Sequence, residues 1–475
     1  MGRSTHAVVL GGGHAGMLAA TALARHADTV TVVDRDRLPL DAPEPRKGVP
    51  QARHLHVLMS GGARAIDALL PGTVDRLRER GAHRLGVPED VVTLSADGWQ
   101  HRFPETQFMI TATRDLTDWT VRDQALRQER VRLLQECEVR ELLGGPGRVT
   151  GVRVATAGEG PGTVRDLPAD LVVDCTGRAS RLRQWLAALG VPAVPEEVVD
   201  SGLAYATRLY EAPPGAREGF PVVNVFSDYR APVPGRSASL VPVEGGRWMI
   251  SLTGTRGGRP PRREDEFDTF ARSLRSPLIA RLMAAARPLT GVQGSSTAAN
   301  RRFYCERAAA WPDGLVVLGD SLVAFNPVYG TGMSAAARSA LALAQVLADG
   351  GLDGSCARRA QRAIGAVVDD PWTMATSQDI CYPEVRTTVV DPRLTRRTPE
   401  EDRSAQYFGR LALRHPEVNA ALTDVITLNA PMSRLSSPQV LAALGGAGAL
   451  PELTGPPLRP AERALLDAAP APAPG

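Results

Sequence analysis

Three glycines near the N-terminus have the spacing of a phosphate-binding turn. Gly11, Gly13 and Gly16 follow an apolar, β-branched run at residues 5–10 and open a segment with leucine and alanine at helical spacing. In a strand–turn–helix unit, such glycines permit a tight turn and the close approach of a pyrophosphate, while free amides at the helix start face the phosphates. A glycine turn with a purely structural role is the alternative interpretation.

An acid at the end of the second strand favours the phosphate-binding interpretation. Asp34 ends the apolar run 29–34, where its carboxylate can accept hydrogen bonds from the hydroxyls of a ribose. The spacing therefore predicts a dinucleotide whose adenosine carries a free 2′-hydroxyl. The predicted contacts are Gly11, Gly13, His14, Ala15, Gly16, Asp34 and Arg35.

A second signature, LGDSLVAFNPVYGTGMS at residues 318–334, indicates which dinucleotide binds. Asp320 follows another apolar strand and offers a carboxylate to a polyol hydroxyl. Pro327, Gly330 and Gly332 shape a turn whose amides, at the start of a helix from Met333, can point at the electron-rich edge of a ring. A flavin has both features, a ribityl chain and a pyrimidine edge that becomes anionic on reduction. FAD is therefore the predicted cofactor.

Buried-type strands position these residues. Strands are predicted at 5–10, 29–34 and 315–320, with short β segments between 138 and 175 and a β-rich stretch at 200–255. Helices are predicted at about 54–70 and 117–136, and the chain is mostly helical from about 355 to 445.

The predicted fold class is α/β, a Rossmann-type FAD-binding domain with an inserted β-sheet substrate domain and a helical C-terminal region. The FAD-binding domain is assigned to 1–80, 105–185 and 290–355, and the substrate domain to 81–104 and 186–289. The helical region is assigned to 356–450. A flexible tail rich in alanine and proline is assigned to 451–475.

Composition excludes several other classes. The 475 residues carry 55 basic and 52 acidic side chains, a net charge of +3, which lacks the basic excess of a nucleic-acid-binding protein. The sequence has neither a long apolar run for a membrane span nor the pattern of a signal peptide. Five scattered cysteines, none in a C-x-x-C pair, predict neither disulfides nor a zinc site, and favour the cytoplasm. His54 and His56 lack a nearby carboxylate or thiol partner, so no metal is predicted.

The two glycine signatures together resemble those of the FAD-dependent monooxygenases of the para-hydroxybenzoate hydroxylase fold, and the resemblance covers most of the chain. It implies that Arg114 and Arg122 introduce a helix that contacts FAD, and that Lys47 and Gln51 lie in a loop beside the isoalloxazine ring. Solvated surface charges are the alternative interpretation for Arg122 and Lys47.

One departure from this family concerns the electron donor. Many members that use NAD(P)H carry an Asp-Gly motif where this chain has Thr176-Gly177. Thr176 and Gly177 are still expected to line the FAD. The flavin is then reduced by NAD(P)H directly or through a separate flavin reductase.

Five stretches resemble the flavin-dependent epoxidases of polyether ionophore biosynthesis, of the lasalocid and monensin type. They are RKGVPQARHLHVL, DGWQHRFPETQFMI, DSGLAYATRLY, VLGDSLVAFNPVYGTGMS and the ATSQDICYP region at 375–383. The resemblance implies that a flavin 4a-hydroperoxide made with molecular oxygen epoxidises alkenes of a linear, hydrophobic polyene polyketide in antibiotic biosynthesis.

An alkene needs no protein acid or base for this reaction, so no catalytic side chain is predicted. The protein is instead expected to hold the alkene in a water-free, apolar pocket between the inserted sheet and the flavin. The candidate pocket residues are Tyr205, Trp248, Phe325 and Tyr329, and core packing is the alternative role for the two strand residues Tyr205 and Trp248.

Other functions on the same fold stay open. An aromatic hydroxylase would need a group that assists deprotonation of a phenol, and no residue of the sequence identifies itself as one. A flavin-dependent reductase acting on polyprenyl chains, or a flavoprotein without catalysis, would have the same cofactor signatures. The absence of a W-x-W-x-I-P motif argues against a flavin halogenase.

Overall fold

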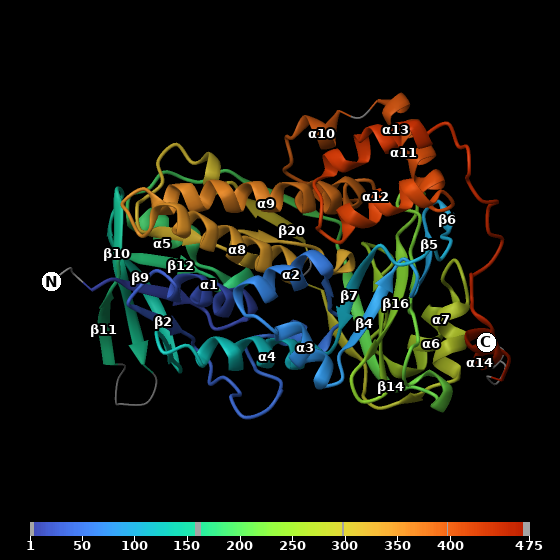
Figure 1. Ribbon diagram of the computed structural model, residues 1–475, viewed down its shortest axis with the longest axis horizontal. Coiled ribbons are helices and arrows are strands. Elements are labelled where there is room, and N and C mark those ends of the chain that lie inside the picture. The colour runs from blue at the N-terminus through green and yellow to red at the C-terminus, as the bar shows by residue number, and fades with distance from the viewer. Residues whose placement is uncertain (1–3, 157–162, 297–298, 397, 469–475) are drawn as a thin grey trace.

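The computed structural model describes residues 4–156, 163–296, 299–396 and 398–468 (Figure 1). A five-stranded parallel sheet lies at the N-terminal end of the molecule, in the order β21-β12-β1-β2-β8. Its strands are β1 (His6–Leu10), β2 (Thr29–Val33), β8 (Val131–Leu134), β12 (Leu171–Asp174) and β21 (Leu315–Val317). Their apolar residues are buried on both faces of the sheet, as in α/β folds.

Helices cover this sheet. Helices α1 (His14–Ala24), α2 (Ser60–Leu69) and α8 (Gly332–Gly350) pack on one another, and α4 (Arg114–Leu126) contacts α1. Smaller helices are α3 (Thr73–Glu79) and α5 (Leu182–Ala188). A three-stranded meander of β9 (Cys137–Gly145), β10 (Arg148–Thr156) and β11 (Thr163–Pro168) flanks the sheet.

Two of the predicted helices have different bounds in the structure. The helix predicted at 117–136 ends at Leu126, because Val131–Leu134 pairs in parallel with β2 and forms the fifth strand. The helix predicted at 54–70 begins only at Ser60, after the short strand β3 (Val57–Met59). In both cases a strand partner far along the chain supplies hydrogen bonds that the local helical pattern does not reveal.

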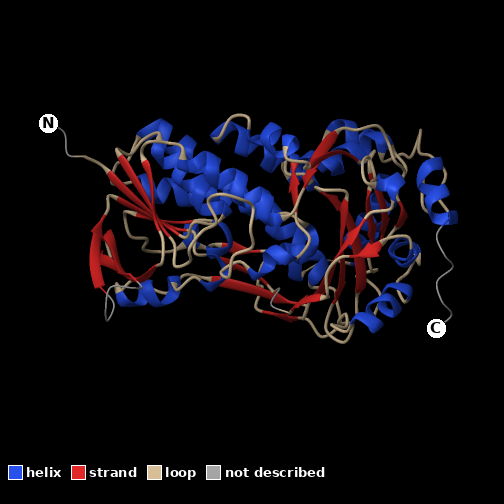
Figure 2. Cartoon of the chain, turned by 90° about the horizontal axis from the view of Figure 1, so that it is seen from below, coloured by secondary structure: helices blue, strands red, loops and turns tan. Residues whose placement is uncertain are grey.

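A second, eight-stranded sheet lies at the other end of the molecule (Figure 2). Its order is β18-β14-β17-β16-β15-β5-β6, with β19 paired to β14. The strands are β5 (Val91–Ser95), β6 (Gly98–Trp99), β14 (Ala204–Glu211), β15 (Val222–Val225), β16 (Arg236–Val243), β17 (Arg247–Gly254), β18 (Arg287–Pro288) and β19 (Gln293–Ser295).

One face of this sheet packs on α6 (Glu264–Arg272) and α7 (Leu278–Ala284), and the other turns toward the parallel sheet. Two smaller sheets complete the fold, β3-β7-β4 and β22-β20-β13-β23. Their remaining strands are β4 (His83–Val87), β7 (Gln107–Thr111), β13 (Glu196–Asp200), β20 (Asn300–Phe303), β22 (Val323–Ala324) and β23 (Arg386–Thr387).

The C-terminal region is helical, as predicted. The long helix α9 (Cys356–Asp379) runs along α8 toward the helices α10 (Pro392–Thr395), α11 (Pro399–Ala412), α12 (Pro416–Ile426) and α13 (Pro438–Ala443) (Figure 1). The predicted α/β architecture, a Rossmann-type domain with an inserted sheet and a helical C-terminal region, is confirmed.

The prediction of a flexible tail at 451–475 is wrong for part of that range. Residues 460–468 form the helix α14 (Pro460–Ala468), which lies beside α6 and α7 (Figure 1). Leu466 is buried in the core formed by α6, α7 and the large sheet, and Glu462 forms a buried ion pair with Arg102. Residues 469–475 of the predicted tail lie outside the described residues.

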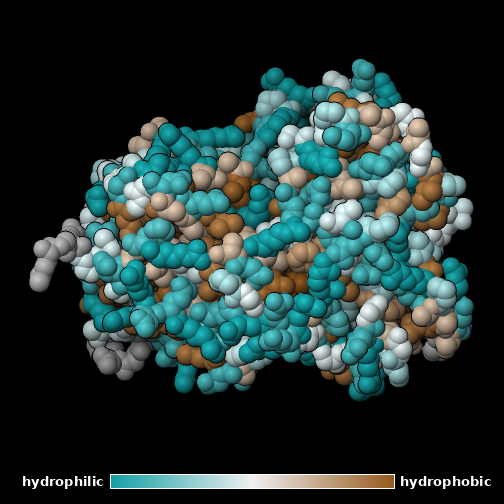
Figure 3. All heavy atoms as spheres, viewed as in Figure 1, coloured by the Kyte–Doolittle hydropathy of each residue, from teal (hydrophilic) through white to brown (hydrophobic). Residues whose placement is uncertain are grey.

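Polar side chains cover most of the molecular face seen in Figure 3, with apolar atoms in scattered patches. Within the described ranges, no helix combines the length and the apolar character that crossing a bilayer requires.

Candidate flavin and substrate site

The first glycine turn has the close packing that requires glycine. Gly11 has a φ of +94°, and a Cβ atom there would lie 2.7 Å from the carbonyl oxygen of Cys175. A Cβ at Gly16 would lie 1.8 Å from the carbonyl oxygen of Gly11. Gly13 precedes α1, and no side chain caps the amides of that helix start. These amides are therefore open to an anionic ligand.

Asp34 lies beside this turn, as its predicted role requires. Its carboxylate accepts a hydrogen bond of 2.6 Å from the Gly12 amide and one of 3.0 Å from the Arg46 guanidinium. Arg46 also reaches over the turn, because a Cβ at Gly13 would lie 3.2 Å from its Nη2. Lys47 and Arg35 are exposed. The cation at the turn is thus Arg46, which was not among the predicted contacts, and not its neighbour Lys47.

A charged cluster of α1 and α4 surrounds His14. Arg114 donates a hydrogen bond of 2.6 Å to Asp118, and Nδ1 of His14 lies 3.7 Å from the same carboxylate oxygen. Burial and the nearby Arg114 lower the pKa of His14 to about 4, so the imidazole is neutral at pH 7. Neither ring nitrogen of His14 has a hydrogen-bond partner of normal geometry among the described residues. A buried imidazole without such partners indicates that a ligand completes the site.

Arg122 is buried, which excludes the interpretation as a solvated charge. Its Nε and Nη2 donate hydrogen bonds of 3.1 and 2.7 Å to the carbonyl oxygen of Pro39. It thereby fixes the segment that follows β2. Gln51, in the short helix Pro50–Arg53, is half-buried. Ala15 lies close to the second signature, since a Cβ atom added at Gly319 would be 2.8 Å from the Cβ of Ala15.

The second signature meets the strand end that carries Thr176-Gly177. The amide and hydroxyl of Thr176 donate hydrogen bonds of 2.9 and 2.6 Å to Asp174, and the Gly177 amide donates one of 2.8 Å to Ser321. The hydroxyl of Ser321 donates a hydrogen bond of 3.1 Å to Asp174, which therefore joins the ends of β12 and β21. The carboxylate of Asp320 is partly exposed and lies 3.7 Å from the guanidinium of Arg178. It is accessible to a ligand hydroxyl.

The turn after β22 begins with the short helix η6 (Pro327–Tyr329). A Cβ at Gly330 would lie 2.6 Å from a methyl group of Val57, so glycine is required for this packing. No side chain caps α8, which follows the turn, and the space around Gly332 is open, while Met333 is buried. The hydroxyl of Thr331 is buried and has no hydrogen-bond partner within the described part of the chain.

The residues at the two turns fit FAD. Two uncapped helix starts offer amides to anionic groups, and Asp34 and Asp320 offer carboxylates to hydroxyls. The buried polar groups that lack partners at these turns are those expected to contact a ligand: both ring nitrogens of His14, Nε of Arg46 and the hydroxyl of Thr331.

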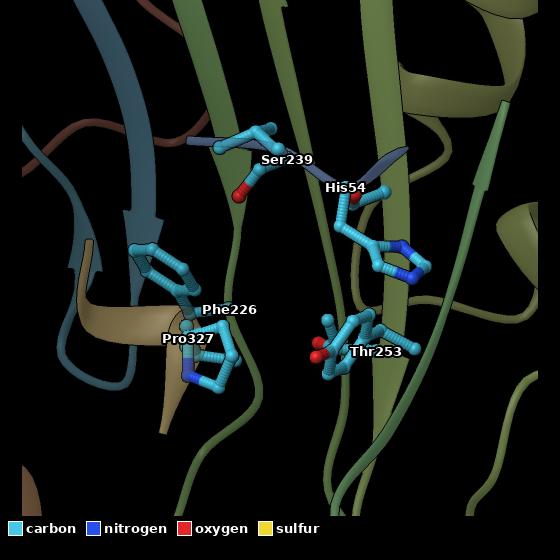
Figure 4. A pocket seen from close by; sticks show the side chains of 9 residues that line it. His54, Phe226, Ser239, Thr253 and Pro327 are labelled. Atoms are coloured by element: carbon cyan, nitrogen blue, oxygen red, sulfur yellow. The ribbon is translucent and has the colours of Figure 1, made fainter. Parts of the chain in front are cut away.

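A small pocket lies where the large sheet meets the η6 turn (Figure 4). In Figure 4, Phe226 and Pro327 lie opposite His54 and Thr253. The pocket is lined by His54, Leu55, Tyr205, Phe226, Ser239, Ser251, Thr253, Pro327 and Val328. About half of these side chains carry a polar group. The prediction of an apolar pocket is therefore only partly correct.

His54 is the nitrogen base in the pocket lining. Its Nδ1 forms a hydrogen bond of 2.9 Å with the hydroxyl of Thr207, which in turn bonds to Ser251. The ring stands edge-on to Tyr205, with 4.3 Å between centroids. Burial, and secondarily Arg53, lowers the pKa of His54 to about 4, so the pocket contains a neutral imidazole at pH 7. In the sequence, the spacing of His54 and His56 suggested only a metal site, which was not predicted.

The structure separates the four predicted pocket residues. Tyr205 lines the pocket, but Trp248 is fully buried on the opposite face of the sheet, against Phe220 and near α6 and α7. Phe325 is buried in the core of the FAD-binding domain, and Tyr329 donates a hydrogen bond to Asp379. The prediction is therefore wrong for Trp248, Phe325 and Tyr329 as lining residues of this pocket.

Strand register explains the separation of Tyr205 and Trp248. Tyr205 pairs with Thr253 across β14 and β17, whereas Trp248 pairs with Tyr210. Because side chains alternate between the two faces of a sheet, residues 205 and 210 of one strand face opposite sides. The same alternation places Ser239, Ser251 and Thr253 on the pocket side, and could have identified them from the sequence.

The fold and this site define a flavoprotein of the para-hydroxybenzoate hydroxylase fold. The model of the FAD binding domain family matches residues 4–355, and the chain belongs to that family. It is 31% identical over 392 residues to Protein Rv3254 of Mycobacterium tuberculosis, an alignment that covers 79% of this chain and 80% of that protein.

Solved structures show the same fold at lower identity. The flavin-dependent brominase Bmp2 has a TM-score of 0.64 at 15% identity, over 93% of this chain and 98% of the other. PqsL, a probable FAD-dependent monooxygenase from Pseudomonas aeruginosa, has a TM-score of 0.57 at 18% identity, over 80% and 94%. The myxobacterial chondrochloren halogenase CndH has a TM-score of 0.59 at 18% identity, over 86% and 90%.

Proposed function

We propose that this protein is an FAD-dependent monooxygenase that epoxidises alkenes of a linear polyene polyketide in polyether antibiotic biosynthesis, and that it acts in the cytoplasm. The observation that carries the proposal is the pocket at the η6 turn. Its lining residues include no carboxylate and no cation, and its one imidazole is neutral and already bonded to Thr207. An alkene is nucleophilic enough to react without deprotonation, so a pocket of this composition suits it.

The residues of the chain supply binding and orientation. The two glycine turns, Asp34, Arg46 and Asp320 hold the cofactor, and the η6 turn carries Pro327 and Val328 into the pocket wall. Bound FAD, once reduced, supplies the activation of molecular oxygen. Tyr205 and Phe226 exclude water from the reacting double bond and hold it in place, which increases the rate through orientation.

The polar half of the pocket favours a polyketide over a polyprenyl chain. The hydroxyl of Ser239 donates a hydrogen bond of 2.7 Å to Asn224, which leaves its lone pairs to accept from a substrate hydroxyl. A polyprenyl chain has no group that would satisfy such a hydroxyl, whereas a polyketide carries oxygen substituents along its length.

A specific feature also supports aromatic hydroxylation as a second candidate. His54, Thr207 and Ser251 form a connected chain of exchangeable protons at the pocket wall. Such a chain could move a phenol proton out of the site.

Isotope labelling tests these alternatives. The FAD-loaded protein is incubated with a reductant and a trisubstituted linear polyene under labelled oxygen. We expect a product that contains one labelled oxygen atom per epoxidised alkene. A product that gains two hydrogens and no label would contradict the proposal, and labelling only of a phenol supplied in parallel would favour the second candidate.

The same assay tests the electron donor. Thr176-Gly177, in place of Asp-Gly, supports reduction by a separate flavin reductase, so we expect slow turnover with NAD(P)H alone and fast turnover when a flavin reductase is added. Equal rates in both arms would assign direct reduction by NAD(P)H.

A further inference from the structure

The last residue of α9 is a buried carboxylate at the centre of a hydrogen-bond network. Asp379 is only 2% exposed. It accepts hydrogen bonds of 2.7 Å from Nδ2 of Asn300, 2.7 Å from Nδ2 of Asn326 and 2.8 Å from the hydroxyl of Tyr329. Charge-assisted hydrogen bonds of this kind are stronger than those between neutral groups. Burial raises the pKa of the Asp379 carboxyl, and the donated hydrogen bonds offset part of that effect.

Two of these donors belong to the turn that forms the pocket wall. Asn326 precedes η6, and its side-chain oxygen accepts a hydrogen bond of 3.0 Å from the Val328 amide. The backbone amide of Asn326 donates a hydrogen bond of 2.6 Å to the side-chain oxygen of Asn300. Tyr329 ends η6. The conformation of the stretch that carries Pro327 and Val328 is therefore determined by contacts that converge on Asp379.

The segment after α9 also contacts a second part of the same pocket wall. The hydroxyl of Tyr382 lies 2.7 Å from that of Ser227, which follows the lining residue Phe226. The Ser227 amide donates a hydrogen bond of 2.9 Å to Ser237. Phe226 lies on the same side of the pocket as Pro327 in Figure 4, so both parts of this wall are attached to the C-terminal end of α9 and the residues that follow it.

We propose that Asp379 is a positioning residue, which holds the η6 turn in the conformation that presents its glycines to the flavin and its Pro327 and Val328 to the substrate. This role rests on the proposed flavin site. It assigns a function to the ATSQDICYP segment at 375–383, which contains Asp379. Helix α9 lies outside the residues matched by the FAD binding domain family, yet Asp379 at its end contacts the η6 turn.

The three donors suit a carboxylate, which accepts at both of its oxygens. Burial raises the pKa of Tyr329 well above its ordinary value, so the phenol retains its proton and donates it at physiological pH. Asparagine at position 379 can keep its side-chain oxygen toward the amides of Asn300 and Asn326, which both donate to Oδ2, but it then places an NH2 group against the hydroxyl of Tyr329, which has to change from donor to acceptor. The substitution has nearly the same shape, but it removes the negative charge and the charge-assisted character of all these hydrogen bonds.

The experiment measures FAD binding to the apoprotein, the visible spectrum of the bound flavin and the flavin reduction potential. We expect Asp379→Asn to weaken FAD binding about tenfold or more and to change the spectrum and the potential. Tyr329→Phe removes only one of the donors to Asp379 and leaves the carboxylate in place, so we expect a smaller loss of affinity, about threefold to fivefold, in the same direction.

Asp369→Asn is the matched control. Asp369 lies on the same helix but pairs with Arg302 and Arg393, each at 2.8 Å, away from the turn. We expect it to lower thermal stability and to leave FAD affinity, spectrum and potential unchanged.

Wild-type FAD affinity and potential in folded Asp379→Asn, or equal changes in Asp369→Asn, would overturn the proposal. If circular dichroism shows that Asp379→Asn does not fold, Tyr329→Phe decides in the same way. None of these readouts uses a substrate, so the proposed epoxidation can fail while the role of Asp379 stands.

Discussion

At the scale of single residues, one cationic side chain, Arg46, lies over the first glycine turn. Arg46 donates to Asp34 and reaches over Gly13, while the adjacent Lys47 is exposed. The sequence drew attention to Lys47, its only lysine. Two neighbouring cations differ in role because only one of them points into the turn, and local sequence does not determine that direction.

This difference predicts the outcome of two substitutions. Arg46→Ala removes the cation that lies over the first glycine turn, where the proposed flavin site holds its phosphates, so we expect FAD affinity to fall about tenfold or more. Lys47→Ala should change it by less than about twofold, because an exposed charge contributes little. Fluorescence quenching of FAD by the apoprotein measures both. A larger loss for Lys47→Ala than for Arg46→Ala would contradict the placement of the two side chains.

At the scale of elements, helix α14 shows how tertiary contacts order a segment of unfavourable composition. The stretch around it is rich in alanine and proline, yet Leu466 is buried and Glu462 receives two hydrogen bonds, of 2.8 and 2.7 Å, from Arg102. Both side chains of this ion pair are 7% exposed. The helix is therefore expected to contribute to the stability of the large sheet against which it lies.

Glu462→Gln tests this contribution. The substitution leaves the buried Arg102 without its main counter-charge, and we expect the free energy of unfolding to fall by about 2 kcal/mol. Asp467→Asn, on the same helix and part of an exposed pair at 3.7 Å from Arg281, should change it by less than about 0.5 kcal/mol. Urea unfolding followed by circular dichroism measures both. Equal midpoints for the two variants would show that α14 contributes nothing to the stability of this sheet.

At the scale of the whole molecule, three histidines around the proposed cofactor and substrate sites are neutral at pH 7: His14 and His54 are buried and His56 is half-buried. Burial lowers the pKa of His14 and of His54 to about 4 and that of His56 to about 3, from an ordinary value of 6.5. In the unfolded chain these groups take up protons as the pH falls below 6.5, whereas in the folded protein they do not. Acid therefore favours the unfolded state.

The expected result is a loss of stability between about pH 6.5 and pH 4, by up to about 1.4 kcal/mol per pH unit for each histidine. Above pH 6.5 their contribution is complete and constant. Urea midpoints measured across this range test the sign. His54→Gln should make the pH slope shallower by about one proton, and an unchanged slope would mean that His54 is protonated in the folded state.

The predictable part of this protein is local. The two glycine turns, Asp34 and Asp320 each follow a strand whose apolar residues are adjacent in the sequence, so sequence pattern alone determined the cofactor, the strand–turn–helix units and the fold class. The face of a strand residue is also partly predictable, because side chains alternate between the two faces of a sheet. Once β14 is paired with β17, this alternation places Tyr205 and Trp248 on opposite faces.

What only the tertiary structure decided depends on partners far apart in the chain. Strand β8 exists because it pairs with β2, Trp248 is buried because α6 and α7 cover its face, and the η6 turn depends on Asp379, 50 residues beyond Tyr329. The energy of a buried group depends on what surrounds it in space. Residue types and spacing describe only neighbours along the chain, and therefore do not determine which distant donor or apolar face will meet that group.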